Sequence, residues 1–197
     1  MQWKISMKMI NHFVEENTCY DGSQIQPLWA LDQIGIKGSS IVSWIGSMEI
    51  KPSKIIDVED VGLEIKSKEM THFIVEHFDC QPTNIKLCYH RQRILVMILK
   101  DELARWGVQC TRSGDDLFVG NGKLTVSIAT ISATSMKIHL GINIISEGTP
   151  EDVETIGILE TGNIGRKDLF LFINNISEAY IEEIESIERD ISKTRAF

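Results

Sequence analysis

The stretch GDDLFVGNGKLTVSIATISATSMKIHLGINI, residues 114–144, carries the clearest fold signal in the sequence. It contains three runs rich in β-forming residues: DLFV, KLTVSIATIS and MKIHLGINI. The turn-forming segments GNG and SATS separate these runs. We therefore predict a three-stranded antiparallel meander.

The two faces of this meander differ in chemistry, because side chains alternate between faces along a strand. Apolar residues are expected on the core face: Leu124, Val126, Ile128, Met136, Ile138, Leu140, Ile142 and Ile144. Small or polar residues are expected on the other face: Lys123, Thr125, Ser127, Ala129, Lys137, His139, Gly141 and Asn143. This face is either a ligand-binding surface or the ordinary polar side of a half-exposed sheet. Ala129 and Gly141 favour a ligand, since glycine weakens a strand unless something approaches closely.

The segments around the meander predict an α+β domain. RQRILVMILKDELARWG has a broad apolar stripe and Gly107 at its end, and is expected to form a helix lying across the sheet. We also expect a short helix in DGSQIQPLWALDQIGIKG, a strand in SSIVSWIGSMEI and another short helix in MTHFIVEHFD. Thr149 and Pro150 have the positions of a helix cap and a first helical residue.

A long amphipathic helix is predicted over residues 168–193, with aliphatic and aromatic residues on one side and Glu and Asp on the other. It packs either on its own sheet or against a second copy, which would make the protein a homodimer. Its acidic face disfavours a membrane surface.

The composition is that of an ordinary globular chain of 197 residues. We predict a single domain, 1–197, because no linker or repeat divides the sequence. The net charge of -8 and the pI near 5.2 disfavour nucleic acids and anionic membranes as partners. No apolar run reaches the length of a membrane span, and the first residues lack a signal-peptide centre. Four cysteines without a CxxC pair fit a reducing compartment, so we expect a cytoplasmic protein.

Two clusters of chemically active side chains are candidates for further sites. Glu69, His72, Glu76, His77 and Cys80 lie close in sequence, but their spacing matches no standard metal motif, so no metal site is predicted. His72 and Glu76 remain candidates for the rim of a pocket. The adjacent Asp115 and Asp116 suit either a turn or a Mg²⁺ ion that also takes phosphate oxygens.

Residues 91–146 resemble the core of the biotin and lipoate protein ligases, a class II synthetase-like fold. That family has an Asn-Asp pair opening a strand, a Lys seven residues later and a Gly-x-Gly-x-Asn strand. Asp115 and Asp116 stand at the pair, Lys123 follows Asp116 by seven residues, and His139, Gly141 and Asn143 fall on the later strand. The whole chain, including YDGSQIQPLWA, GDDLFV and SEGTP, is also similar to an archaeal family described as a domain of unknown function.

The ligase resemblance implies a mixed, mostly antiparallel sheet with helices on one face. It also implies ATP-dependent activation of a small carboxylic acid and transfer of the acyl group, in some members to an acceptor protein, with ATP and Mg²⁺ as cofactors. Lys123 and Asp116 would be catalytic. Asp115, Thr125, Ser127, His139, Gly141 and Asn143 would line the ligand site.

The sequence also departs from the ligases, because their Arg- and Gly-rich phosphate loop is absent. GIKGSSIVSW supplies Lys37 in that region, and one lysine does not replace paired arginines. The alternative is a non-catalytic small-molecule-binding or assembly protein on the same fold.

Overall fold

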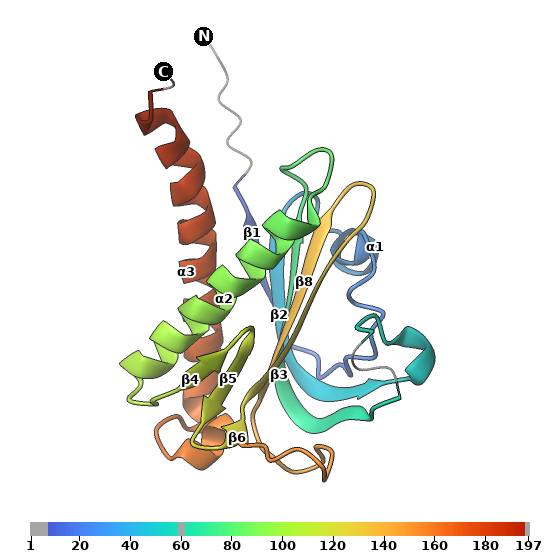
Figure 1. Cartoon of the computed structure of the whole chain (residues 1–197), viewed down its shortest axis with the longest axis vertical. Helices are drawn as coiled ribbons and strands as arrows, with labels where there is room; N and C mark the ends of the chain where they lie inside the picture. Colours follow the sequence, from blue (N-terminus) through green and yellow to red (C-terminus); the bar gives the residue numbers. More distant parts are fainter. Residues whose placement is uncertain (1–7, 59–61, 196–197) are drawn as a thin grey trace.

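The computed structural model describes residues 8–58 and 62–195, and a five-stranded sheet in the order β1-β2-β3-β8-β7 forms its centre (Figure 1). The strands are β1 (Ile10–Val14), β2 (Ser40–Ile50), β3 (Ile65–His77), β7 (Thr125–Ile131) and β8 (Met136–Asn143). β1 pairs with β2 in parallel, and every other pair of neighbours is antiparallel. The predicted α+β class and mixed, mostly antiparallel sheet are confirmed.

Two long helices, α2 (Ile85–Arg105) and α3 (Leu169–Asp190), cover one face of the sheet, with α2 crossing it obliquely (Figure 1). We call this the helix face. The short helix α1 (Trp29–Ile34) covers the opposite face, the α1 face, over a second apolar cluster. The 3-10 turns are η1 (Pro52–Lys54), η2 (Ile158–Thr161), η3 (Arg166–Asp168) and η4 (Ile191–Lys193).

The ends of these helices follow their sequence signals. Asn84 caps α2, since its side-chain oxygen accepts a hydrogen bond from Leu87 N at 3.0 Å. Gly107, at φ 81°, lets the chain turn away after Trp106. Gly35, at φ 74°, ends α1 in the same left-handed conformation.

The short helix predicted in MTHFIVEHFD is wrong, because this segment lies inside strand β3. β3 is central in the sheet and buried on both faces. Met70 and Ile74 pack toward α1, whereas Phe73 and Val75 pack toward α2 and α3. Apolar residues therefore occur at both parities, and the alternation that identifies a half-buried strand is missing.

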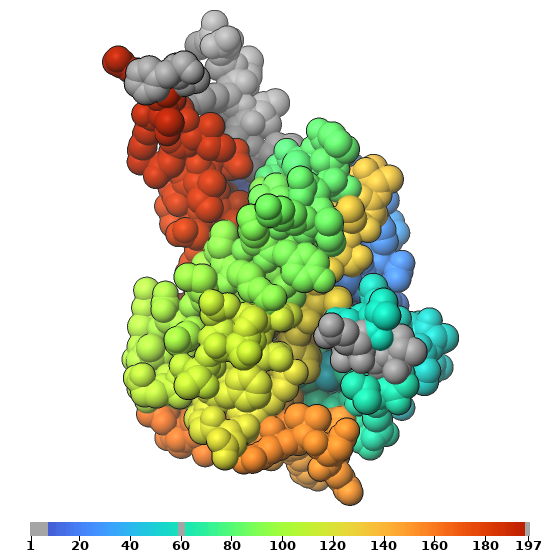
Figure 2. Space-filling view, in the orientation of Figure 1, coloured from blue at the N-terminus to red at the C-terminus, as the bar shows by residue number. Residues whose placement is uncertain are grey.

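The predicted three-stranded meander is also wrong in part, because its first strand belongs to another sheet. β5 (Asp116–Val119) pairs with β4 (Thr111–Ser113) and β6 (Gly122–Lys123) in a small sheet beside α2. Only β7 and β8 form the expected hairpin in the main sheet. Figure 2 shows the small sheet next to α2 on the outer surface of the helix face.

The predicted distribution of β7 residues between the faces is wrong as well. Thr125, Ser127 and Ala129 lie opposite Ile142, Leu140 and Ile138, and residues directly opposite share a face. Those β7 residues therefore lie on the helix face, while His139 and Gly141 lie on the α1 face beside Ile128 and Val126. The register of the hairpin, which periodicity within each strand does not specify, decides this pairing.

No α-helix begins at Thr149 and Pro150. Thr149 hydrogen-bonds the hydroxyl of Thr155 at 2.7 Å, and Thr155 forms a parallel bridge with Lys123. Backbone bonds from Lys123 N to Glu154 O and from Ile156 N to Lys123 O extend this contact. The segment is extended and lies beside β6. Its backbone pairing with Lys123 outweighs the local preference for a helix.

Candidate functional site

The predicted catalytic pair is formed as an ion pair on the small sheet. Lys123 Nζ lies 2.9 Å from Asp116 Oδ2, and each side chain is 29% exposed. Burial raises the pKa of Asp116, and the hydrogen bond from Lys123 opposes that rise. The pair is partly open to solvent, so a ligand can approach the lysine.

Asp115 is already engaged by residues of α2. Arg93 Nη1 lies 2.5 Å from Asp115 Oδ1, and Gln92 Nε2 donates to Asp115 Oδ2 at 2.9 Å. Gln92 Nε2 also lies 2.9 Å from Ser127 Oγ, which donates to His139 O at 2.8 Å. Asp115 and Ser127 therefore meet at one glutamine on the helix face.

Thr125 and Asn143 hold the backbone around Lys123. Thr125 Oγ1 accepts from Leu117 N at 2.9 Å. Asn143 Nδ2 donates to Lys123 O at 3.4 Å, and its Oδ1 accepts from Ser67 Oγ at 3.3 Å. These contacts give both residues a positioning role for the small sheet.

His139 and Gly141 lie on the α1 face, where the chain itself fills the space around them. The Tyr20 ring stacks on His139 with centroids 3.7 Å apart and planes 5° from parallel. A Cβ on Gly141 would lie 2.9 Å from Met70 Cε and 3.1 Å from a Val126 methyl. Gly141 thus leaves room for Met70, and the His139 ring packs against Tyr20.

His72 joins this stack as a neutral imidazole. Its Nε2 lies 3.3 Å from Gly46 O and 3.2 Å from Ser47 O, so it carries the proton. Its Nδ1 then accepts from His139 Nε2 at 3.1 Å. Burial lowers the pKa of His72 to about 4 and lowers the pKa of His139 well below its usual value.

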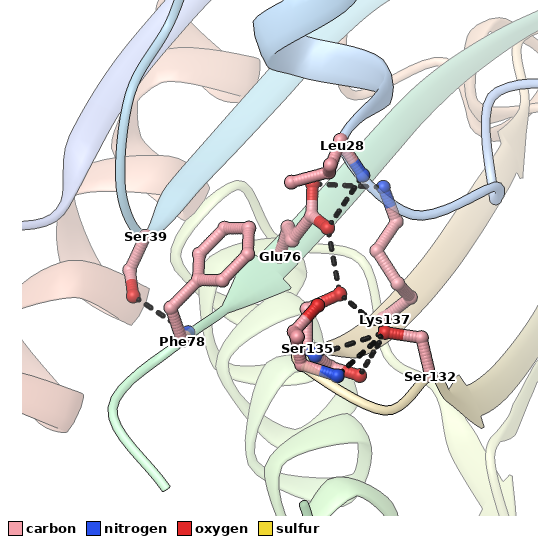
Figure 3. A network of polar contacts seen from close by, with 8 residues as sticks. Leu28, Ser39, Glu76, Phe78, Ser132, Ser135 and Lys137 are labelled. Atoms are coloured by element: carbon pink, nitrogen blue, oxygen red, sulfur yellow. Dashed lines mark hydrogen bonds and ion pairs between the residues drawn. The ribbon is translucent and has the colours of Figure 1, made fainter. Parts of the chain in front are cut away.

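Glu76 is the centre of a buried polar network that ties α1 to the sheet (Figure 3). Its Oε1 accepts from Leu28 N at 2.9 Å and from Ser135 Oγ at 2.7 Å. Lys137 Nζ lies 3.2 Å from its Oε2. Burial lowers the pKa of Lys137, and the Glu76 carboxylate opposes that shift.

The cluster around His72, Glu76 and His77 is divided between the two faces of strand β3. His72 and Glu76 lie on the α1 face, whereas His77 points to the helix face and hydrogen-bonds Tyr180 Oη at 2.8 Å. Within residues 8–58 and 62–195, no three His, Cys, Asp or Glu side chains are grouped to hold a metal ion.

A cavity of about 750 Å³ lies beside α1, and sequence reasoning missed it. Its lining combines aromatic, amide and acidic side chains: Val14, Glu16, Thr18, Ser23, Gln24, Gln26, Pro27, Trp29, Asp32, Gln33, Ile34 and Trp44. None of the ten predicted site residues is among them. The available signal was Trp29 and Asp32 at i and i+3, which places them on one side of a helix.

Trp29 and Trp44 form a corner of this cavity. Their ring centroids are 5.7 Å apart and their planes meet at 37°. Trp44 is 1% exposed, and its indole Nε1 donates to Thr18 O at 2.8 Å. The described residues that line the cavity include Glu16 and Asp32 but no Lys, Arg or His.

A smaller cavity of about 210 Å³ lies on the other side of Gln26 and Pro27, which line both. Its lining includes Thr130, Ser132 and Lys137. Lys137 connects this cavity with the Glu76 network. The segment before α1 therefore separates two cavities.

Across the described ranges, no helix has the length and apolarity needed to cross a membrane.

Comparison with known proteins gives two close relatives. An uncharacterized protein of Methanocaldococcus jannaschii is 39% identical over 188 residues, covering 92% of this chain and 82% of the relative. A solved protein of unknown function from Pyrococcus horikoshi superposes with a TM-score of 0.88 at 36% identity, covering 96% of this chain and 99% of that one.

More distant solved structures share the fold. The biotin protein ligase from Aquifex aeolicus, in complex with biotin and ATP, gives a TM-score of 0.57 at 10% identity, covering 87% of this chain and 71% of that one. A putative lipoate protein ligase from T. acidophilum gives 0.53 at 8% identity, covering 90% and 85%. The fold is thus that of the biotin and lipoate protein ligases. The chain itself belongs to the family described as Domain of unknown function (DUF366), whose model matches residues 9–195.

Proposed function

We propose that this protein binds a small organic molecule in the cavity beside α1. The observation that carries the proposal is the cavity itself, whose volume of about 750 Å³ falls in the usual range for ligand sites. Trp29 and Ile34 offer apolar contact area, and Gln26 and Gln33 offer hydrogen-bonding groups. Such a mixture of aromatic walls with a few polar groups is typical of binding sites.

Charge favours binding over ATP-dependent chemistry in this cavity. A nucleoside triphosphate needs positively charged side chains nearby. The charged residues of the described lining are the negative Glu16 and Asp32. The sequence also lacks the Arg- and Gly-rich loop that the ligase resemblance would require. A non-catalytic binding protein on a ligase-like fold is therefore the function that we place first.

ATP-dependent activation of a small carboxylic acid is the second candidate, because Lys123 and Asp116 form their ion pair. A lysine that is 29% exposed can reach an incoming carboxylate or α-phosphate. Asp115 and Asp116 would help to hold Mg²⁺ beside ATP. The Aquifex ligase is a structure with biotin and ATP, which motivates testing both ligands here.

A thermal-shift experiment separates these candidates, since a ligand that binds only the folded state raises the melting temperature. The panel contains Mg²⁺ with ATP, Mg²⁺ alone, biotin, lipoate, octanoate and small cationic, neutral and anionic fragments. We expect a fragment to stabilise the wild type but not Trp29→Ala, with Lys123→Ala behaving as wild type. A shift with Mg²⁺ and ATP that Lys123→Ala abolishes would favour the acyl-activating enzyme. If no compound raises the melting temperature, binding in the cavity is ruled out for this panel.

The proposal also includes a cytoplasmic location and a homodimer. The four cysteines are free thiols, which suits the cytoplasm. An acceptor protein is required only by the acyl-transfer candidate. A homodimer through α3 is supported by Phe170 and Leu171, which are 59% and 53% exposed at its start.

A further inference from the structure

The cavity beside α1 is acidic and aromatic, and this combination selects a ligand by charge. We propose that its ligand is an organic cation with an apolar body, such as a primary or quaternary ammonium compound. The inference rests on the proposed binding function and specifies its ligand. It follows from the partly exposed ring of Trp29, from the buried Trp44 behind it, and from two carboxylates that have no positive partner in the described residues.

Trp29 suits a cation because its ring is only partly buried and the face of an indole attracts positive charge, while the buried Trp44 packs against it. Trp44 is held by its bond to Thr18 O and by burial under α1. Trp29 lies in the first turn of α1, whose start is fixed by the bond from Leu28 N to Glu76. The ring of Trp44 and the backbone that carries Trp29 are therefore fixed before a ligand arrives, which lowers the entropic cost of binding.

The two carboxylates of the cavity have no positive partner in the described parts of the chain. Neither Glu16 nor Asp32 makes a side-chain hydrogen bond or an ion pair there. Other carboxylates on this side of the sheet do, since Asp21 pairs with Lys54 and Glu76 with Lys137. Both carboxylates are exposed, so a ligand ammonium group can reach them while its apolar body lies against Trp29.

Other ligand classes fit this lining less well. A carboxylate or phosphate would meet two negative charges and no compensating cation. A neutral polyol would bond to Gln26 and Gln33 but would gain nothing from the negative potential of the two carboxylates. Val14, Pro27 and Ile34 complete the lining and match the apolar body of an amine.

The test compares three compounds with one phenyl ring and different charges: 2-phenylethylamine, 2-phenylethanol and phenylacetate. Affinity is measured on the full chain by tryptophan fluorescence and by calorimetry. We expect the amine to bind roughly tenfold more tightly than the alcohol, with phenylacetate the weakest. Added salt should weaken only the amine, because screening acts on charge.

Variants place this preference in the cavity. Asp32→Asn and Glu16→Gln should each reduce the preference for the amine over the alcohol. Asp101→Asn, on the exposed side of α2, removes the same charge from the opposite face and should change nothing. Melting temperatures of all three variants confirm that the fold is retained.

The outcomes separate this inference from the proposed function. If the alcohol or phenylacetate binds as tightly as the amine, or if Asp32→Asn leaves the preference intact, the cation inference is wrong while small-molecule binding stands. If none of the three binds but a neutral or anionic fragment from the panel binds and is lost in Trp29→Ala, the same conclusion holds. If no compound of any charge binds, both proposals fail.

Discussion

Gly46 allows the close backbone contact that forms one side of the cavity. A Cβ at this position would lie 1.9 Å from Thr18 O, the carbonyl that also accepts the Trp44 indole bond. The absence of a side chain therefore allows the segment containing Thr18 to lie directly on β2. This close approach brings Thr18 to the rim of the cavity and Trp44 to its floor.

We predict that Gly46→Ala displaces this segment and lowers the free energy of unfolding by roughly 1–3 kcal/mol, the usual cost of overpacking. Urea unfolding measures the loss. Gly165→Ala is the matched control, because its Cβ would meet only the end of the Asp168 side chain, at 3.2 Å. Equal stability of Gly46→Ala and wild type would contradict the close contact.

The buried histidines predict how stability depends on pH. His72, His77 and His139 are at most 2% exposed, and burial is the largest cause of their lowered pKa values. The unfolded chain therefore binds more protons than the folded protein below about pH 6.5. The contribution of these three histidines to the free energy of unfolding is therefore complete above that pH and is lost as the pH falls toward 4.

For His72 alone the loss is on the order of 3 kcal/mol by pH 4, since its pKa falls from 6.5 to about 4. Urea unfolding between pH 4 and 8 tests this prediction. His72→Asn should flatten the profile relative to wild type, whereas a change at the exposed His90 should not. A wild-type profile that is flat over this range would mean that the histidines are not held neutral.

At the scale of elements, α1 starts from a strained residue. Leu28 has φ 64°, a left-handed conformation that costs a residue with a side chain roughly 1–2 kcal/mol. The bond from Leu28 N to Glu76 compensates for part of this cost. The strain lies next to Trp29, where the conformation of the backbone sets one wall of the cavity.

Two substitutions at Leu28 measure this strain. Leu28→Ala keeps the strain and removes most of the side chain, whereas Leu28→Gly removes both. We predict that Leu28→Gly is more stable than Leu28→Ala by about 1 kcal/mol in urea unfolding. Equal free energies of unfolding for Leu28→Ala and Leu28→Gly would show that the backbone at residue 28 relaxes in the alanine variant.

The Glu76 network predicts that loss of this carboxylate strongly destabilises the protein, and that removing the Lys137 charge as well restores part of the stability. Glu76→Gln leaves the ammonium group of Lys137 buried without its carboxylate and should cost roughly 3–5 kcal/mol. Glu76→Gln combined with Lys137→Met removes the unpaired charge and should recover part of that loss. An additive double variant would show that the two side chains do not interact.

Elements with one clear signal could be predicted from the sequence, and those decided by long-range pairing could not. β2 was predicted because β-forming residues dominate it, α2 has a broad apolar stripe, and Gly35 ends α1 as expected. β3 was misassigned because a strand buried on both faces does not alternate. The predicted site was divided between two faces because the β7–β8 register pairs Ser127 with Leu140 rather than with His139.

The cavity could not be predicted for a related reason. Its lining comes from β1, β2, α1 and the connection between them, so only the folded chain assembles it. Lys123 and Asp116 were predictable as a pair because they lie on neighbouring strands joined by a short turn. Their catalytic role remains a prediction.

At the scale of the whole molecule, two unlike layers cover the sheet. The helix face carries α2, α3 and the small sheet (Figure 1). The cavity lies on the α1 face. The net charge of -8 gives the molecule a field that attracts cations at long range. Both the shape and the charge of the chain are thus consistent with a ligand that approaches α1.

The most direct measurement is a nitrogen-15 spectrum of the indole N–H groups during titration with pooled cationic, neutral and anionic fragments. Trp29 and Trp44 line the cavity, whereas Trp106 lies on the helix face with its indole bonded to Glu102 at 3.0 Å. The account predicts that a bound fragment shifts the signals of Trp29 and Trp44 and leaves that of Trp106 unchanged. Fragments that shift Trp106 alone, or none of these signals, would contradict ligand binding in the cavity beside α1.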